Sequence, residues 1–127
     1  MQNQKLSIDR ADFVGRYLSE IGLGIGSVSL RLVNLGGPGA TSIVTVVISG
    51  QFLLGVNGKN YLGIDPAPEL AIALSSLLNE SISDVGVDEM SQVRIAFGPD
   101  RFLEIHPDTN GFESATINIP GKDIFVI

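Results

Sequence analysis

The chain carries its chemically versatile side chains in its last third. His106 is the single histidine, with Asp100 and Glu104 before it and Asp108 and Glu113 after it. A histidine among carboxylates could transfer protons or bind a metal ion. A metal site needs at least three converging ligands, however, and the chain has no cysteine. We therefore expect no metal, no cofactor and no catalytic site, and we interpret His106 as a strand-end residue before a solvated turn.

Two glycine-rich segments imitate nucleotide-binding motifs without the elements those motifs need. Residues 22–26 read Gly-Leu-Gly-Ile-Gly, but no helix pattern follows that could receive a pyrophosphate. Residues 36–42 lack the lysine of a phosphate loop and precede a strand pattern. We interpret residues 22–26 as a hairpin turn and expect no phosphate site in either segment.

Net charge limits the kinds of partner. Eight Lys and Arg residues stand against fourteen Asp and Glu, which gives a formal charge of −6. This charge disfavours nucleic acid and anionic membranes, and it suits a protein partner with a basic surface. The longest dense apolar run, residues 43–48, is far shorter than the roughly 20 residues of a spanning helix. The first ten residues lack the apolar core of a signal peptide, so we expect a cytoplasmic, bacterial-type protein.

An internal repeat indicates how the chain is organised. Residues 18–23, Leu-Ser-Glu-Ile-Gly-Leu, align with residues 82–87, Ile-Ser-Asp-Val-Gly-Val, at an offset of 64. One inserted residue later, the alternating apolar residues of 28–32 align with those of 93–97. Alternation with a period of two is typical of a strand with one buried face. We expect a β-hairpin in each copy.

The first strand of each copy departs from strict alternation, because its apolar residues fall at i, i+3 and i+5. A β-bulge near residues 19–20, and another near 83–84, would restore the phase. In the first copy, a helix over residues 9–21 is the alternative, since apolar residues there also have helical spacing. The second copy lacks that spacing, which favours strands.

The remaining patterns predict the rest of the fold. A helix over residues 66–79 has an apolar stripe at Leu70, Leu74 and Leu77, and further strand patterns flank it on both sides. The sequence thus predicts an α+β fold in which two similar antiparallel β-units are joined by one helix. Residues 1–127 then form one domain, with the first β-unit at 16–56 and the second at 80–127. Further strands are expected at 43–48, 51–56, 61–64, 101–105 and 115–119, and an edge strand at 124–127.

The second half also contains a longer motif. Residues 93–108, Val-Arg-Ile-Ala-Phe-Gly-Pro-Asp-Arg-Phe-Leu-Glu-Ile-His-Pro-Asp, lead to Phe112-Glu113-Ser-Ala. This stretch resembles a pattern L-x-l-x-F-x-d-G-x-x-L-x-v-x-P-d closing on Y-E-x-W, which occurs in small uncharacterised bacterial proteins of the immunity-protein-like type. The chain departs from that pattern in its Gly-Pro-Asp-Arg turn, in Phe112 and in Ala115.

The resemblance implies a non-enzymatic acidic protein that masks a partner protein, in the manner of an immunity protein that neutralises a toxin. Glu113 matches the acidic residue of the motif, and it either fixes a turn by accepting backbone N–H groups or meets a basic group on the partner. We expect the partner surface at Asp100, Glu104, His106, Asp108, Phe112 and Glu113. The alternative is a structural, accessory or homo-oligomeric domain.

Overall fold

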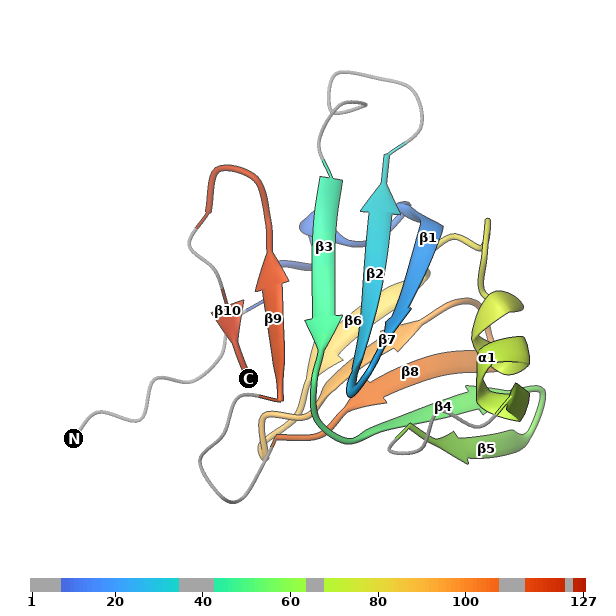
Figure 1. The fold of residues 1–127 in the computed structure, drawn as a ribbon. Helices are drawn as coiled ribbons and strands as arrows, with labels where there is room; N and C mark the ends of the chain where they lie inside the picture. The colour runs from blue at the N-terminus through green and yellow to red at the C-terminus, as the bar shows by residue number, and fades with distance from the viewer. Residues whose placement is uncertain (1–7, 35–42, 64–67, 108–113, 123–124) are drawn as a thin grey trace.

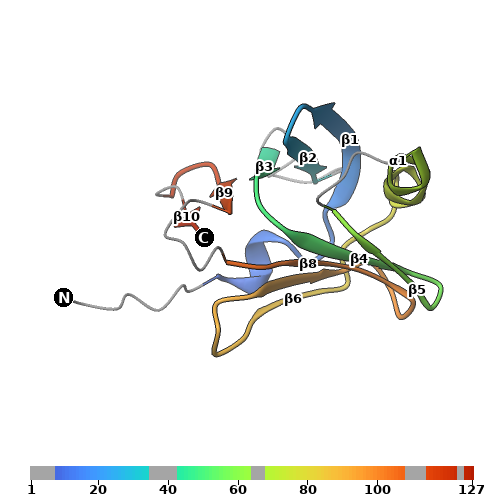
Figure 2. The same ribbon diagram turned by 60° about the horizontal axis from the view of Figure 1, so that its bottom comes forward.

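Two antiparallel β-sheets make up most of the residues that the structure describes. Sheet A has the strand order β1-β2-β3-β9-β10, and sheet B has the order β5-β4-β8-β7-β6. The sheets cross one another around a shared apolar core (Figures 1 and 2). This computed structural model describes residues 8–34, 43–63, 68–107, 114–122 and 125–127. The strands are β1 (Tyr17–Gly24), β2 (Ser27–Val33), β3 (Ile43–Ile48), β4 (Phe52–Val56), β5 (Lys59–Leu62), β6 (Asp84–Val87), β7 (Val93–Ala96), β8 (Arg101–Ile105), β9 (Ala115–Asn118) and β10 (Phe125–Val126).

The predicted α+β class is wrong, because the described residues are mostly antiparallel β-structure. Helix in the described ranges is limited to α1 (Pro68–Ser75) and a 3-10 turn, η1 (Arg10–Asp12). Residues 9–21 contain that short turn and the start of β1 in place of a long helix. The strand interpretation of the N-terminal segment is therefore correct from Tyr17 onward.

Helix α1 is shorter than the predicted helix over 66–79. The hydroxyls of Ser75 and Ser76 each donate a hydrogen bond of 2.6 Å to the carbonyl three residues earlier. Such local bonds compete with continuation of a helix, and turns follow. Residues 66–67, at the predicted start, lie outside the described residues.

The two β-units are not separate bodies joined by a helix, because each contributes strands to both sheets. Strands β1, β2 and β3 lie in sheet A, whereas β4 and β5 lie in sheet B. In the second half, β6, β7 and β8 lie in sheet B, whereas β9 and β10 lie in sheet A. The two sheets have equivalent strand orders: β1, β2 and β3 of sheet A correspond to β6, β7 and β8 of sheet B, and β9 and β10 correspond to β4 and β5. The units expected at 16–56 and 80–127 are thus interleaved.

The hairpins β1-β2 and β6-β7 share backbone details at aligned positions. The β1–β2 register shifts at Ser19, which confirms the bulge predicted there. The Ser19 hydroxyl donates a hydrogen bond of 3.2 Å to the carbonyl of Arg31. The aligned Ser83 hydroxyl donates a bond of the same length to the carbonyl of Ala96. A serine at the aligned position therefore bonds to the facing strand in each hairpin. The register of β6 and β7 is regular from Asp84 to Val87, so the bulge predicted near residues 83–84 is not seen within β6.

The segments that precede the two hairpins pair with each other. The Leu18 N–H donates to the carbonyl of Glu80 at 3.1 Å, and the Ile82 N–H donates to the carbonyl of Arg16 at 2.8 Å. Each bond is the other's counterpart at the offset of 64. The same relation places η1 against β6 and α1 against β1. Helix α1 is therefore the element that introduces the second hairpin, as η1 introduces the first.

The core lies between the inward faces of the two sheets. β3 is central in sheet A, as its apolar sequence predicted, and its residues alternate between half-buried and buried. Strand alternation explains this burial, because every second side chain points to the opposite sheet. The innermost side chains include Phe13, Leu30, Leu32, Phe52, Leu54, Leu77, Ile95 and Leu103.

Candidate functional site

The structure does not gather the sequence-predicted partner residues at one rim. Asp100 precedes β8, whereas His106 follows the other end of that strand. At about 3.3 Å per residue, the separation of these two residues along the strand is roughly 20 Å. Glu104 and His106 do lie together. Asp108, Phe112 and Glu113 lie outside the described residues.

Glu104 is the centre of a polar cluster on the outer face of sheet B. His106 Nε2 lies 2.8 Å from one carboxylate oxygen, and Arg94 Nη1 lies 3.8 Å from the other. Arg94 is directly opposite Glu104 in the register of β7 and β8, so strand pairing places the two charges together. The carboxylate is therefore shared between an imidazole and a guanidinium.

Phe102 extends this cluster with an aromatic surface. Its partner in β4 is Gly55, and a Cβ atom at Gly55 would overlap the Phe102 ring. The Arg94 guanidinium lies over the same ring, 3.9 Å from its centroid, within the range of a cation–π contact. The ring is thus held between glycine and arginine on a half-buried surface. We name Arg94, Phe102, Glu104 and His106 the β8 face.

The tip of the second hairpin lies beside one end of the β8 face. Val93, the first residue of β7, pairs with Ile105, the residue before His106. The Asp88 carboxylate fixes the tip by accepting hydrogen bonds from two backbone N–H groups, at 2.8 and 2.9 Å. The exposed Glu89 and Met90 lie within this tip. An acidic and apolar tip therefore adjoins the polar cluster.

Among the described residues, no three His, Asp or Glu side chains are grouped so that they could hold a metal ion. The pair of His106 and Glu104 lies on a sheet face and does not line the pocket described next. In the described part of the chain, no helix has the length and apolarity needed to cross a bilayer.

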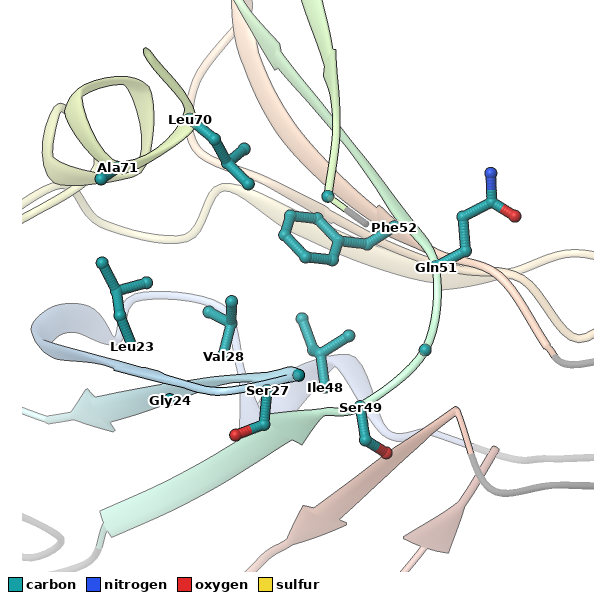
Figure 3. Close-up of a pocket in the computed structure, with 13 residues that line it drawn as sticks. Leu23, Gly24, Ser27, Val28, Ile48, Ser49, Gln51, Phe52, Leu70 and Ala71 are labelled. Carbon is teal, nitrogen blue, oxygen red and sulfur yellow. The ribbon is translucent and has the colours of Figure 1, made fainter. Parts of the chain in front are cut away.

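An apolar pocket of about 420 Å³ opens at the tip of the first hairpin. It lies between that tip, the connection from β3 to β4, and the first turn of α1 (Figure 3). Such a volume falls within the range of roughly 300–1,000 Å³ that is typical of small-molecule sites. Its apolar lining comes from Leu23, Val28, Ile48, Phe52, Leu70 and Ala71.

Sequence reasoning missed this pocket, although residues 22–26 carry its signal. The prediction of a hairpin turn there is confirmed, with Gly26 in a left-handed conformation at φ 74°. The glycines also leave space at the pocket rim, because Gly24 and Gly26 line it without side chains. The opposite wall comes from Phe52 in β4 and Leu70 in α1, which lie far from the hairpin in sequence. Only the folded chain brings these walls together.

No family model, curated protein or solved structure matches the chain. The resemblance to immunity-protein-like proteins therefore stays a prediction. The functional argument rests on the chemistry of the two places just described, the β8 face and the pocket.

Proposed function

We propose that this protein is a non-enzymatic binding protein that masks a basic partner protein, as an immunity protein masks a toxin. The observation that carries the proposal is the β8 face, where Phe102 is held between Gly55 and Arg94. Aromatic and arginine side chains dominate the energy of protein interfaces when they are held in a fixed position. The side chains that a partner would contact on this face are therefore already held in position before binding. The proposal places this encounter in the cytoplasm.

Charge supports a basic partner. The net charge of −6 favours encounter with a positive surface, and it raises the association rate at low salt. Exposed carboxylates flank the β8 face, with Glu89 at the neighbouring hairpin tip and Asp100 before the strand. Glu104 is already paired with Arg94 and His106, so its role is to order the face.

Capture of the partner from a lysate of the native host is the first experiment. The partner is then purified, and its association and dissociation rates are measured by surface plasmon resonance. We expect Arg94→Ala and Phe102→Ala to weaken binding by about tenfold or more, as interface anchors do. Arg31→Ala is the matched control, because it removes a cross-strand arginine–glutamate pair from the other hairpin. Equal changes in affinity for all three variants would reject the β8 face as the partner-binding surface.

A charge variant tests the steering separately. The double variant Glu89→Lys with Asp100→Lys should slow association by about tenfold at low salt, and added salt should reduce the difference. Its free energy of unfolding should change by less than about 0.5 kcal/mol, since both side chains are exposed. An unchanged association rate would show that this charge does not guide the partner.

A homo-oligomeric accessory domain is the second candidate. The observation in its favour is the outer edge of sheet A, which is formed by β10 and where Val126 is 50% exposed. Such an edge offers unpaired backbone groups to a strand of another copy. Light scattering over a wide concentration range tests this candidate, and a constant monomer mass would reject it.

A further inference from the structure

The side chains that point into the pocket at the first hairpin are apolar. Leu23, Val28 and Ile48 point from sheet A toward Leu70 and Phe52, which close the pocket from the other side (Figure 3). The side chains of Ser27, Ser49 and Gln51 point away from that space (Figure 3). An occupant therefore meets hydrocarbon on both sides.

The mouth of the pocket is open, and the described residues that line it are uncharged. Leu23 is 59% exposed, whereas Ile48 and Phe52 at the floor are almost completely buried. Within the part of the chain that the structure describes, no Asp, Glu, Lys or Arg lines the pocket. An anionic head group at the mouth would gain no ion pair from these described lining residues and would meet a protein of charge −6. An uncharged head group has neither disadvantage.

The tip of the second hairpin is built differently from the tip that frames the pocket. Gly24 and Gly26 at the pocket rim align with Asp88 and Ser91 in the second copy. There the Asp88 carboxylate accepts two backbone hydrogen bonds and occupies the tip. The first tip keeps bare glycine backbone beside an exposed leucine. The copies therefore differ at the residues that frame the pocket.

We propose that this pocket binds the aliphatic chain of an uncharged, single-chain amphiphile, with the head group left in solvent at the mouth. The hydrocarbon walls receive the chain, and the exposed Leu23 covers it where it leaves the pocket. Burial of apolar surface is the driving force, so affinity depends on chain length. This site is separate from the β8 face and does not depend on the function proposed above.

Displacement of a neutral fluorescent dye, N-phenyl-1-naphthylamine, measures the binding. The chain has no tryptophan, so the dye signal has little background from the protein. Octyl, nonyl and decyl maltoside, each below its micelle concentration, should displace the dye with an affinity that rises about fourfold per methylene. Decanoate should displace it less well than decyl maltoside. Absence of saturable binding, or affinity independent of chain length, would overturn the proposal.

Matched variants locate the site. Leu23→Asp should weaken decyl maltoside binding at least tenfold, because it removes a wall and places a charge at the mouth. Met90→Asp makes the same change in charge at the other hairpin tip, where the side chain is 74% exposed, and it should leave binding unchanged. Ala71→Phe, from the helix side, should also weaken binding by filling the pocket. Equal effects of Leu23→Asp and Met90→Asp would place the site elsewhere.

A second copy of the chain is the competing occupant. Ile25 is fully exposed at the same hairpin tip and could enter the pocket of another copy. In that case Ile25→Asp would abolish a dimer detected by light scattering, and decyl maltoside would dissociate that dimer. A monomer that binds the maltoside, with Ile25→Asp unchanged, supports the small-molecule site. A dimer that depends on Ile25 would overturn it.

Discussion

The two hairpins of this chain share one framework and differ at their tips. In both, a serine hydroxyl bonds to the facing strand at 3.2 Å, at Ser19 in the first hairpin and Ser83 in the second. Before both, a residue with positive φ introduces the strand: Gly15 at 90° and Asn79 at 67°. The repeated features are therefore those that set the path of the backbone.

The tips carry different chemistry. The first tip has a two-residue turn at Ile25-Gly26, with an apolar pocket beside it. The second has a five-residue loop, closed by the Asp88 carboxylate and flanked by the β8 face. Where the copies agree the residues serve the fold, and where they differ we place the two proposed binding sites. The experiments below change the residues on which this division depends.

The largest expected effect comes from a pair of positions whose side-chain sizes are exchanged between the copies. The Gly63 N–H donates to the carbonyl of Phe52 at 2.9 Å, and the Ile127 N–H donates to the carbonyl of Ala115 at the same distance. A Cβ atom at Gly63 would overlap the Phe52 ring. In the first copy the large residue Phe52 is paired with the small residue Gly63. In the second copy the small residue Ala115 is paired with the large residue Ile127.

We expect Phe52→Ala to cost about 3–5 kcal/mol through the cavity it leaves. Gly63→Ile should cost about 1–3 kcal/mol through overpacking against the ring. The double variant recreates the pair of the second copy, so its cost should fall below the sum by about 1–3 kcal/mol. Urea unfolding of all four proteins measures this coupling. Additive costs would show that the two pairs are not equivalent.

Local patterns explain why the hairpins were predictable and the arrangement of the sheets was not. The alternation and the bulge at Ser19 depend on neighbouring residues, and both are readable from the sequence. The pairing of β3 with β9, and of β4 with β8, joins segments more than forty residues apart and leaves no periodic signal. The prediction of two self-contained β-units failed at that point, because each unit contributes strands to both sheets.

The candidate site follows the same rule. Glu104 lies in β8 and His106 follows two residues later, just past its end, so their proximity was predictable. The Phe102 contact instead needs Gly55 from a different strand. The pocket likewise needs α1 and residues 48–52 beside the first hairpin. The residues at the pocket floor have the same sequence pattern as residues of any core strand, so periodicity alone could not distinguish a pocket floor from the core.

Substitution of the positive-φ residues before the two hairpins should give the next largest change in stability. Gly15→Ala should cost about 1–2 kcal/mol, because an L side chain is disfavoured in the left-handed region and no atom within 4 Å would compensate. Asn79→Gly should change stability by less than about 0.5 kcal/mol, since asparagine already tolerates this conformation. Thermal unfolding of both variants checks the contrast. An equal cost at both positions would contradict the proposed equivalence.

The closed tip of the second hairpin gives a smaller effect. Asp88→Ala removes the acceptor for the N–H groups of Met90 and Gln92 and should cost about 1 kcal/mol. Glu89→Ala, one residue along, is the control and should change little. Gly24→Asp in the first hairpin should not stabilise it, because a Cβ there lies only 2.9 Å from the Ser27 hydroxyl. Hydrogen exchange at the Gln92 amide would report the loss locally.

The smallest effect concerns two lysines that follow the corresponding turns Asn57-Gly58 and Pro120-Gly121. Lys122 donates a hydrogen bond to the Asp12 carboxylate in η1, and this bond raises the pKa of the lysine above its ordinary value of 10.5. Lys59 instead lies 5.6 Å from the centroid of the Tyr61 ring. The position that aligns with Asp12 is Ser76, which carries no charge.

A raised pKa means that the lysine binds its proton more tightly in the folded state, so the stabilisation is complete below pH 10.5. It is lost as the pH rises through the raised pKa, because the neutral amine no longer pairs with the carboxylate. Lys122→Ala should therefore lower the melting temperature slightly at pH 7 and low salt, and the difference from wild type should shrink above pH 10.5. Lys59→Ala should show no such convergence, since no carboxylate faces that lysine in the described contacts. If the difference in melting temperature between Lys122→Ala and wild type persists at the highest pH, then the aliphatic part of the Lys122 side chain, and not the ion pair, holds η1 to the second half of the chain.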